Sequence, residues 1–123
     1  MEPLLSNGQK VLVDMNYYSN HSISRGDIVL VKFKTIDQPY IKRVAAIPGD
    51  IVEFGIEDNN SGRVVLVYPG CKEGCILSRQ LEARNNTVPI STVILLGDNT
   101  KGSFDSVEFG LVSIENIIGK VLI

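Results

Sequence analysis

The sequence predicts an all-β domain, built as a folded sheet or a barrel, on two observations. First, short runs of apolar and β-branched residues recur along the 123-residue chain, and turn signals rich in Gly, Asn, Asp and Pro separate them. Second, no stretch keeps a 3.6-residue apolar period for three helical turns. The 44% hydrophobic and 21% charged residues are typical of a globular protein. We therefore expect residues 1–123 to form one domain.

Each predicted strand is a short apolar run that ends at a turn signal. The predicted strands are residues 10–14, 27–33, 40–46, 50–54, 63–68, 92–96 and 120–123. One helical turn is predicted at residues 113–116, with Ser113 at its N-cap. Residues 55–90 are more polar and irregular, so we expect a small β excursion from the main sheet there rather than an independent domain.

Composition excludes several classes of function. The net charge is −2 with scattered basic residues, which argues against a nucleic-acid partner. No apolar run approaches the ~18 residues of a membrane span, so an anchor would have to lie outside this sequence. The single histidine, His21, lies in a polar loop segment, and no cluster offers a metal site or a cofactor motif. Cys71 and Cys75 leave two alternatives open, a small disulfide-closed loop or two reduced thiols.

Once these classes of site are excluded, the remaining catalytic possibility is a lysine that acts as a base. Lys42 is the candidate. Residues two apart on a strand share a face, so Tyr40, Val44 and Ala46 flank Lys42. That face is apolar apart from the amine and the tyrosine hydroxyl. Desolvation there would favour the neutral amine and lower its pKa. The alternative is an ordinary strand lysine whose amine reaches solvent.

Three segments together resemble the type I signal peptidase family, in the order and spacing that the family has. The opening Met1-Glu2-Pro3 is similar to the family's Ser-Met-x-Pro, in which the nucleophilic serine stands directly before the Met. The other matching segments are Tyr40-Ile41-Lys42-Arg43-Val44 with Pro48-Gly49-Asp50, and Gly97-Asp98-Asn99 through Ser103-Phe104-Asp105-Ser106 with Phe109-Gly110. The closing Ile118-Gly119-Lys120-Val121 also fits, and residues 55–90 match least.

The resemblance implies a β-fold serine endopeptidase that removes signal peptides from exported preproteins at the extracytoplasmic face of the cell membrane. Lys42 would take the proton of the serine hydroxyl and later give it to the leaving amine. Ser103 would orient the amine of Lys42. The family needs no cofactor or metal, and its membrane anchor would precede residue 1.

The resemblance also implies where the substrate binds. The family adds an extended peptide to a sheet edge, with small pockets for alternate side chains. Pro39, Tyr40 and Ile41 occupy the matching positions before the base. Met1 and Leu4 would wall the pocket for a small residue such as Ala.

A third set of residues would support the site without performing chemistry. Asp98 would pair with Arg43 on the face of the strand opposite Lys42. Asp105 is structural in the family, and Asn99 and Ser106 belong to the same motif. This chain departs from the family at Val107, where an arginine usually partners the aspartate two residues earlier.

The serine expected directly before Met1 is absent from this sequence, so we expect residues 1–123 alone to cleave nothing. Two alternatives stay open. A self-cleaving repressor-type peptidase domain shares the serine–lysine chemistry and a similar opening, but does not predict the Gly97–Ser106 motif. A signal-peptidase-like domain that binds peptides without cutting them is the other.

Overall fold

A computed structural model gives the fold and describes residues 12–34, 38–54, 64–66, 75–97, 106 and 110–122. Strands dominate these residues, which confirms the predicted all-β class. The elements in chain order are β1 (Leu12–Asp14), α1 (Tyr17–Asn20), β2 (Ile28–Val31), β3 (Tyr40–Ala46), β4 (Val52–Phe54), β5 (Val64–Leu66), α2 (Ile76–Glu82), β6 (Thr92–Leu96), β7 (Val112–Ser113), the 3-10 turn η1 (Ile114–Asn116) and β8 (Ile117–Leu122).

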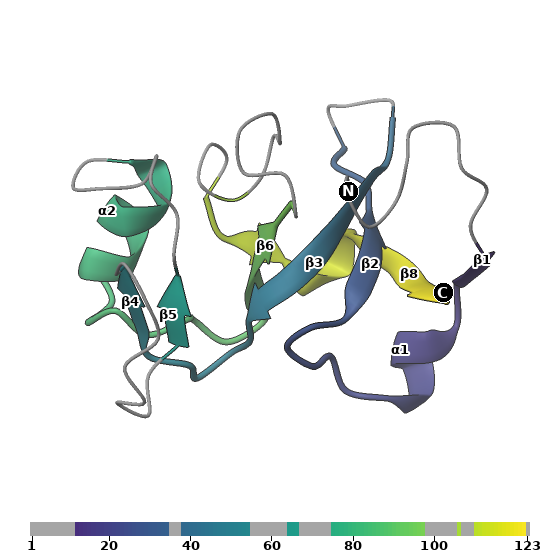
Figure 1. Cartoon of the computed structure of the whole chain (residues 1–123), viewed down its shortest axis with the longest axis horizontal. Coiled ribbons are helices and arrows are strands. Elements are labelled where there is room, and N and C mark those ends of the chain that lie inside the picture. The colour runs from purple at the N-terminus through teal and green to yellow at the C-terminus, as the bar shows by residue number, and fades with distance from the viewer. Residues whose placement is uncertain are drawn as a thin grey trace.

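Six strands form one antiparallel sheet in the order β1-β8-β2-β3-β6-β7. Figure 1 shows this sheet across the molecule, with α1 beside β8 at one end and α2, β4 and β5 at the other. Strand β3 is central, because it pairs with β2 over Tyr40–Arg43 and with β6 over Arg43–Ala46. The register therefore places the candidate base on an interior strand of the sheet.

The core consists of two clusters of buried side chains. The first lies on the main sheet and is built from valine and leucine residues of β2, β3, β6 and β7: Val29, Val31, Val44, Val93, Leu95 and Val112. The second joins the end of β3 to β4, α2, the segment after α2 and β6: Ala46, Val52, Leu77, Leu81, Val88 and Ile94. Strand β3 contributes to both clusters, which is why its inward face is buried from Lys42 to Ala46.

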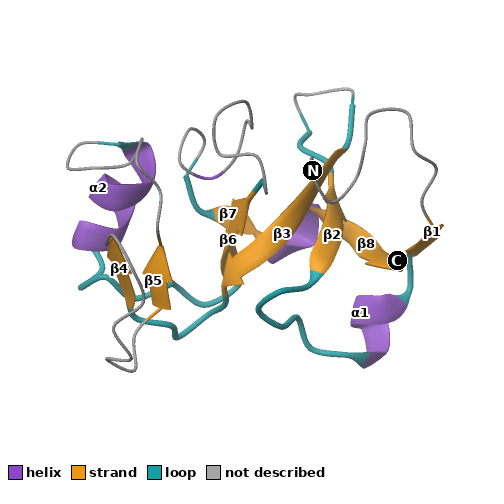
Figure 2. Ribbon diagram, viewed as in Figure 1, coloured by secondary structure: helices purple, strands orange, loops and turns teal. Residues whose placement is uncertain are grey.

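The region from residue 55 to 90 contains a helix that was not predicted, in addition to a strand outside the main sheet. Its described parts contain β5, which pairs in parallel with β4, and also the helix α2 (Figure 2). Sequence reasoning missed α2 because the helix has only seven residues, too few to show an apolar period over three turns. Its two inward leucines, Leu77 and Leu81, are four positions apart and bury one helix face.

Local chemistry explains where α2 begins. Cys75 is the N-cap, where its Sγ accepts a hydrogen bond from the Ser78 N–H at 3.4 Å. The Ser78 hydroxyl donates back to the Cys75 carbonyl at 3.0 Å, which closes the first turn. Cys75 is also disulfide-bonded, and the chain's one other cysteine, Cys71, lies outside the described residues. Of the two alternatives left open for these cysteines, the reduced thiol does not apply to Cys75.

Several smaller expectations can be compared with the structure. The predicted strands at residues 40–46 and 92–96 match β3 and β6, whereas the last strand begins earlier than predicted, at Ile117. The two-residue strand β7 and the one-turn helix α1 were not predicted. The predicted turn after Ser113 is η1, and Ser113 is its N-cap without a side-chain hydrogen bond.

Candidate active site

Lys42 lies in the middle of β3 on its buried face, and only 5% of the residue is exposed. Directly across on β2 is Val29, which is fully buried, and Val44 follows on the same face of β3. The Lys42 Nζ lies 5.7 Å from the centre of the Tyr40 ring. The predicted apolar face around Lys42 is therefore present, and the amine is not in bulk water.

Arg43 lies on the opposite face of β3 because successive strand residues alternate. Its guanidinium donates a hydrogen bond to the Gly26 carbonyl at 3.3 Å. The Gly26 N–H donates to the Val44 carbonyl at 2.8 Å, and the Val44 N–H donates to the Asp27 carbonyl at 2.8 Å, so three hydrogen bonds join the turn before β2 to β3. Asp98, the expected ion-pair partner of Arg43, lies outside the described residues.

The expected substrate-binding residues fall at the beginning of β3. Pro39 is exposed, and Tyr40 and Ile41 are half-buried. At this end β3 pairs with β2, while its ladder with β6 begins only at Arg43. Met1 and Leu4, the other two residues expected in the substrate pocket, lie outside the described residues.

Ser106 is a described residue of the C-terminal motif, as are Gly97 and Gly110, and it is fully buried. Its hydroxyl oxygen accepts a hydrogen bond from the Leu95 N–H at 2.8 Å, and its carbonyl accepts one from the Gly110 N–H at 2.6 Å. Ser106 therefore ties the motif to β6, next to β3. The motif residues Asp98, Asn99, Ser103, Asp105 and Val107 lie outside the described residues.

A polar cluster that sequence reasoning missed joins α1 to β2 and β8. The Tyr18 hydroxyl donates to Asp27 Oδ2 at 2.8 Å, and the Lys120 Nζ lies 3.7 Å from Asp27 Oδ1. Burial, followed by the hydrogen bond to Asp27, raises the pKa of Tyr18 well above its ordinary value. The hydrogen bond with the Tyr17 hydroxyl, at 3.4 Å, raises the pKa of Lys120. These residues are distant in sequence, so no local pattern could have grouped them.

Other kinds of site find no support among the described residues. No group of three or more His, Cys, Asp or Glu side chains there could hold a metal ion. His21 is exposed, as expected, and stacks on the Tyr17 ring with the ring centres 4.1 Å apart. Within the same residues, no helix has the length and apolar character needed to cross a membrane.

Comparison of the sequence with known proteins identifies the family of this chain. The chain matches the model of the family described as "Signal peptidase, peptidase S26" over residues 1–123. It is 29% identical over 135 residues to Signal peptidase IB of Staphylococcus aureus, covering 98% of this chain and 70% of that protein. It is 28% identical over 132 residues to Signal peptidase I of Leptolyngbya laminosa, covering 100% of this chain and 63% of that protein. The chain therefore belongs to the signal peptidase family, peptidase S26, alongside the type I signal peptidases.

Proposed function

We propose that this chain is the catalytic domain of a serine–lysine endopeptidase that cleaves signal peptides from exported preproteins. The observation that carries the proposal is the burial of Lys42 on a strand whose sequence resembles the family's general-base segment. A lysine among Val29, Val44 and Tyr40 loses hydration, and this loss favours the neutral amine that a base requires. A solvated ammonium would have no proton-accepting capacity at neutral pH.

The proposed reaction has two proton transfers at one nitrogen. The nucleophile is the serine that the family motif places directly before Met1. Its hydroxyl attacks the scissile carbonyl while the Lys42 Nζ takes the proton, and a tetrahedral intermediate forms. The resulting ammonium then gives its proton to the leaving amine as the scissile C–N bond breaks, which leaves an acyl-enzyme. Water hydrolyses the acyl-enzyme and releases the serine. Ser103 would orient the Lys42 nitrogen during both transfers.

Support for the strand is part of the same proposal. The Arg43 hydrogen bond to the Gly26 carbonyl holds β3 to the turn before β2, and the Ser106 hydroxyl, which accepts the Leu95 N–H, holds the C-terminal motif to β6. Further support would come from the motif residues Asp98, Asn99 and Asp105.

The substrate would lie in extended form along the beginning of β3, at Pro39, Tyr40 and Ile41. Met1 and Leu4 would form the wall of a pocket for a small side chain. The natural setting would be the extracytoplasmic face of the cell membrane, with the preprotein as partner.

A cleavage assay tests the proposal. The chain is extended at its amino end to include the motif serine and incubated with a preprotein that carries an Ala-x-Ala site. Mass spectrometry should show one cut after the final Ala. Lys42→Met should reduce the rate by a factor of about 100 to 10,000, the usual contribution of a positioned base. Lys34→Met, which changes an exposed lysine before β3, should leave the rate unchanged.

The outcomes separate the competing functions. Cleavage that survives Lys42→Met would exclude Lys42 as the base. Cleavage of the chain itself instead of the preprotein would favour the repressor-type peptidase. Binding of the preprotein without any cleavage by the serine-containing chain would favour a peptide-binding domain.

A further inference from the structure

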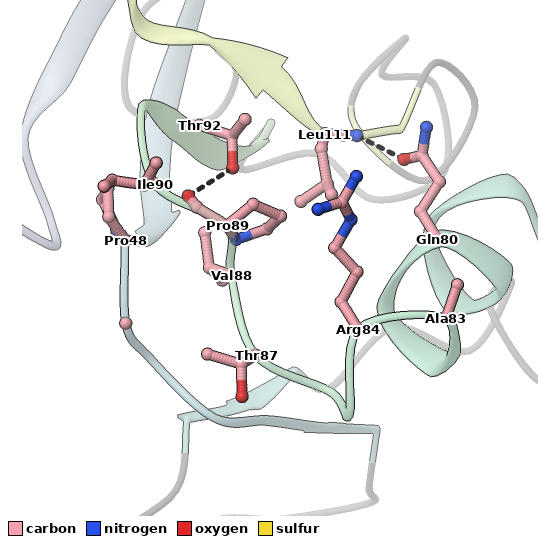
Figure 3. Close-up of a pocket in the computed structure, with 11 residues that line it drawn as sticks. Pro48, Gln80, Ala83, Arg84, Thr87, Val88, Pro89, Ile90, Thr92 and Leu111 are labelled. Atoms are coloured by element: carbon pink, nitrogen blue, oxygen red, sulfur yellow. Dashed lines mark hydrogen bonds between the residues drawn. The ribbon is translucent and has the colours of Figure 1, made fainter.

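The structure contains a hollow away from Lys42, between α2 and the turn that precedes β6. Its volume is about 1020 Å³, and its wall includes Pro48, Val88, Pro89, Ile90 and Leu111 (Figure 3). Pro48 follows Lys42 by six residues, in the turn just after the end of β3. Lys42 itself does not line the hollow. The hollow is therefore a different site from the proposed catalytic one.

Two side chains at the hollow, those of Arg84 and Gln80, carry N–H donors. Arg84 lines it, and its guanidinium has no hydrogen bond or ion pair with any residue that the structure describes. Gln80 also lines the hollow, and its Oε1 accepts the Leu111 N–H at 2.7 Å. That bond assigns the oxygen and leaves the Nε2 group as a donor. Among the described residues that form the wall, none is acidic.

The position of Gln80 depends on a glycine. Gly110 has a φ of +85°, and a Cβ at this position would collide with the Gln80 Oε1. A glycine here therefore lets the Gln80 side chain approach the backbone closely at the edge of the hollow.

The rim of the hollow is apolar and held in place. Ile90 is 85% exposed, although it is a large hydrophobic residue. The next residue, Ser91, takes a φ of 62°, which is uncommon for a residue other than glycine, and its carbonyl accepts the Ile114 N–H at 2.9 Å. The Thr92 hydroxyl donates to the Pro89 carbonyl at 2.8 Å, which closes the same turn. The turn thus presents an apolar side chain to solvent in a fixed conformation.

We propose that this hollow binds an acidic peptide segment, in which one carboxylate side chain is flanked by apolar residues. The carboxylate would bind the Arg84 guanidinium and the Gln80 amide, both of which can only donate there. The apolar neighbours would pack on Pro89, Ile90 and Leu111. A volume at the upper limit of small-molecule sites, about 300 to 1,000 Å³, fits several peptide residues better than a single metabolite.

Fluorescence anisotropy with the whole chain tests this proposal. The probe is a fluorescein-labelled octapeptide with Leu-Glu-Leu at its centre, and the control probe carries Leu-Gln-Leu. Binding of the first probe should weaken about tenfold or more when Glu becomes Gln, because a charge-assisted hydrogen bond is lost. Arg84→Gln should weaken it to the same extent, and Ile90→Ser should also weaken it.

The matched control is Arg79→Gln, which removes the same charge from α2 at an exposed position that does not line the hollow. It should change the affinity by less than about twofold, since exposed charges act weakly at a distance. No binding of the glutamate probe, or equal effects of Arg84→Gln and Arg79→Gln, would overturn the proposal.

Two further measurements address other occupants. Sedimentation velocity that shows a dimer, lost in Arg84→Gln, would assign the hollow to a second copy of the chain. Co-sedimentation with phosphatidylglycerol vesicles that depends on Arg84 would assign it to a lipid surface. Either result would overturn the peptide proposal, because it identifies another ligand for the same guanidinium.

Discussion

Replacing Lys42 with methionine is expected to make the protein more stable, although it should slow the proposed cleavage by a factor of about 100 to 10,000. The side chain of Lys42 is almost fully buried, with Val29 opposite and Val44 beside it. Methionine keeps the length of the aliphatic chain but carries no group that must be desolvated on folding. If Lys42 is retained for catalysis although it destabilises the fold, its replacement should raise the stability and lower the activity.

The magnitude follows from the cost of burying a polar group. Mutational data place that cost at about 1 to 3 kcal/mol. Because the amine of Lys42 has other contacts that methionine would lose, including the Tyr40 ring, we expect a net gain of about 1 to 2 kcal/mol. With a denaturant slope of about 2 kcal/mol per molar urea, the unfolding midpoint should rise by about 0.5 to 1 M.

The assay is equilibrium unfolding of the 123-residue chain in urea, followed by circular dichroism at neutral pH. Arg43→Met is the matched control, because it removes the neighbouring cation from the opposite face of β3. The Arg43 guanidinium donates to the Gly26 carbonyl, so its loss should lower stability by about 0.5 to 1.5 kcal/mol. If Lys42→Met unfolds at a lower urea concentration than the unchanged chain, Lys42 stabilises the fold and the reasoning fails.

Two other expectations concern the opposite end of the sheet. Burial and the hydrogen bond to Asp27 raise the pKa of Tyr18 above its ordinary 10.0, so the stability that this group contributes is fully present below pH 10 and decreases as the pH rises above it. Melting temperatures measured from pH 9 to 12 should fall less steeply for Tyr18→Phe, and parallel curves would contradict this assignment. Gly119→Ala should cost about 1 to 3 kcal/mol, because its Cβ would meet the Asp14 backbone carbonyl of β1. A Cβ at Gly26 would meet no atom within 4 Å, so Gly26→Ala introduces only the backbone strain of a φ of +89°. Calorimetry should therefore show a smaller loss of stability for Gly26→Ala than for Gly119→Ala. Equal losses would refute the steric explanation.

The inward face of β3 was predictable from sequence because alternation is a local property of an extended chain. A lysine at position 42 must share a face with Val44 and Ala46 on any strand that spans them, and the structure has that face buried. The helix α2 was missed for the reverse reason. Seven residues provide too weak a periodic signal, and the helix depends on packing Leu77 and Leu81 into a core formed by distant segments.

Part of the candidate site stays a prediction. The residues assigned through the family motif that lie outside the described residues are Met1, Leu4, Asp98, Asn99, Ser103 and Asp105. For Ser106, the motif indicated a supporting role, and the structure places its buried hydroxyl on the backbone of β6.

The sequence by itself determined the all-β class, the membership of the signal peptidase family and the side of the strand to which Lys42 belongs. Only the tertiary structure decided that Val29 lies across from Lys42, that Asp27 joins Tyr18 to Lys120, and that Arg84 has no counter-charge among the described residues. The physical reason is the distance along the chain over which each effect acts. Side-chain alternation and turn chemistry act within a few residues, whereas burial and charge pairing depend on which distant strands and helices pack together.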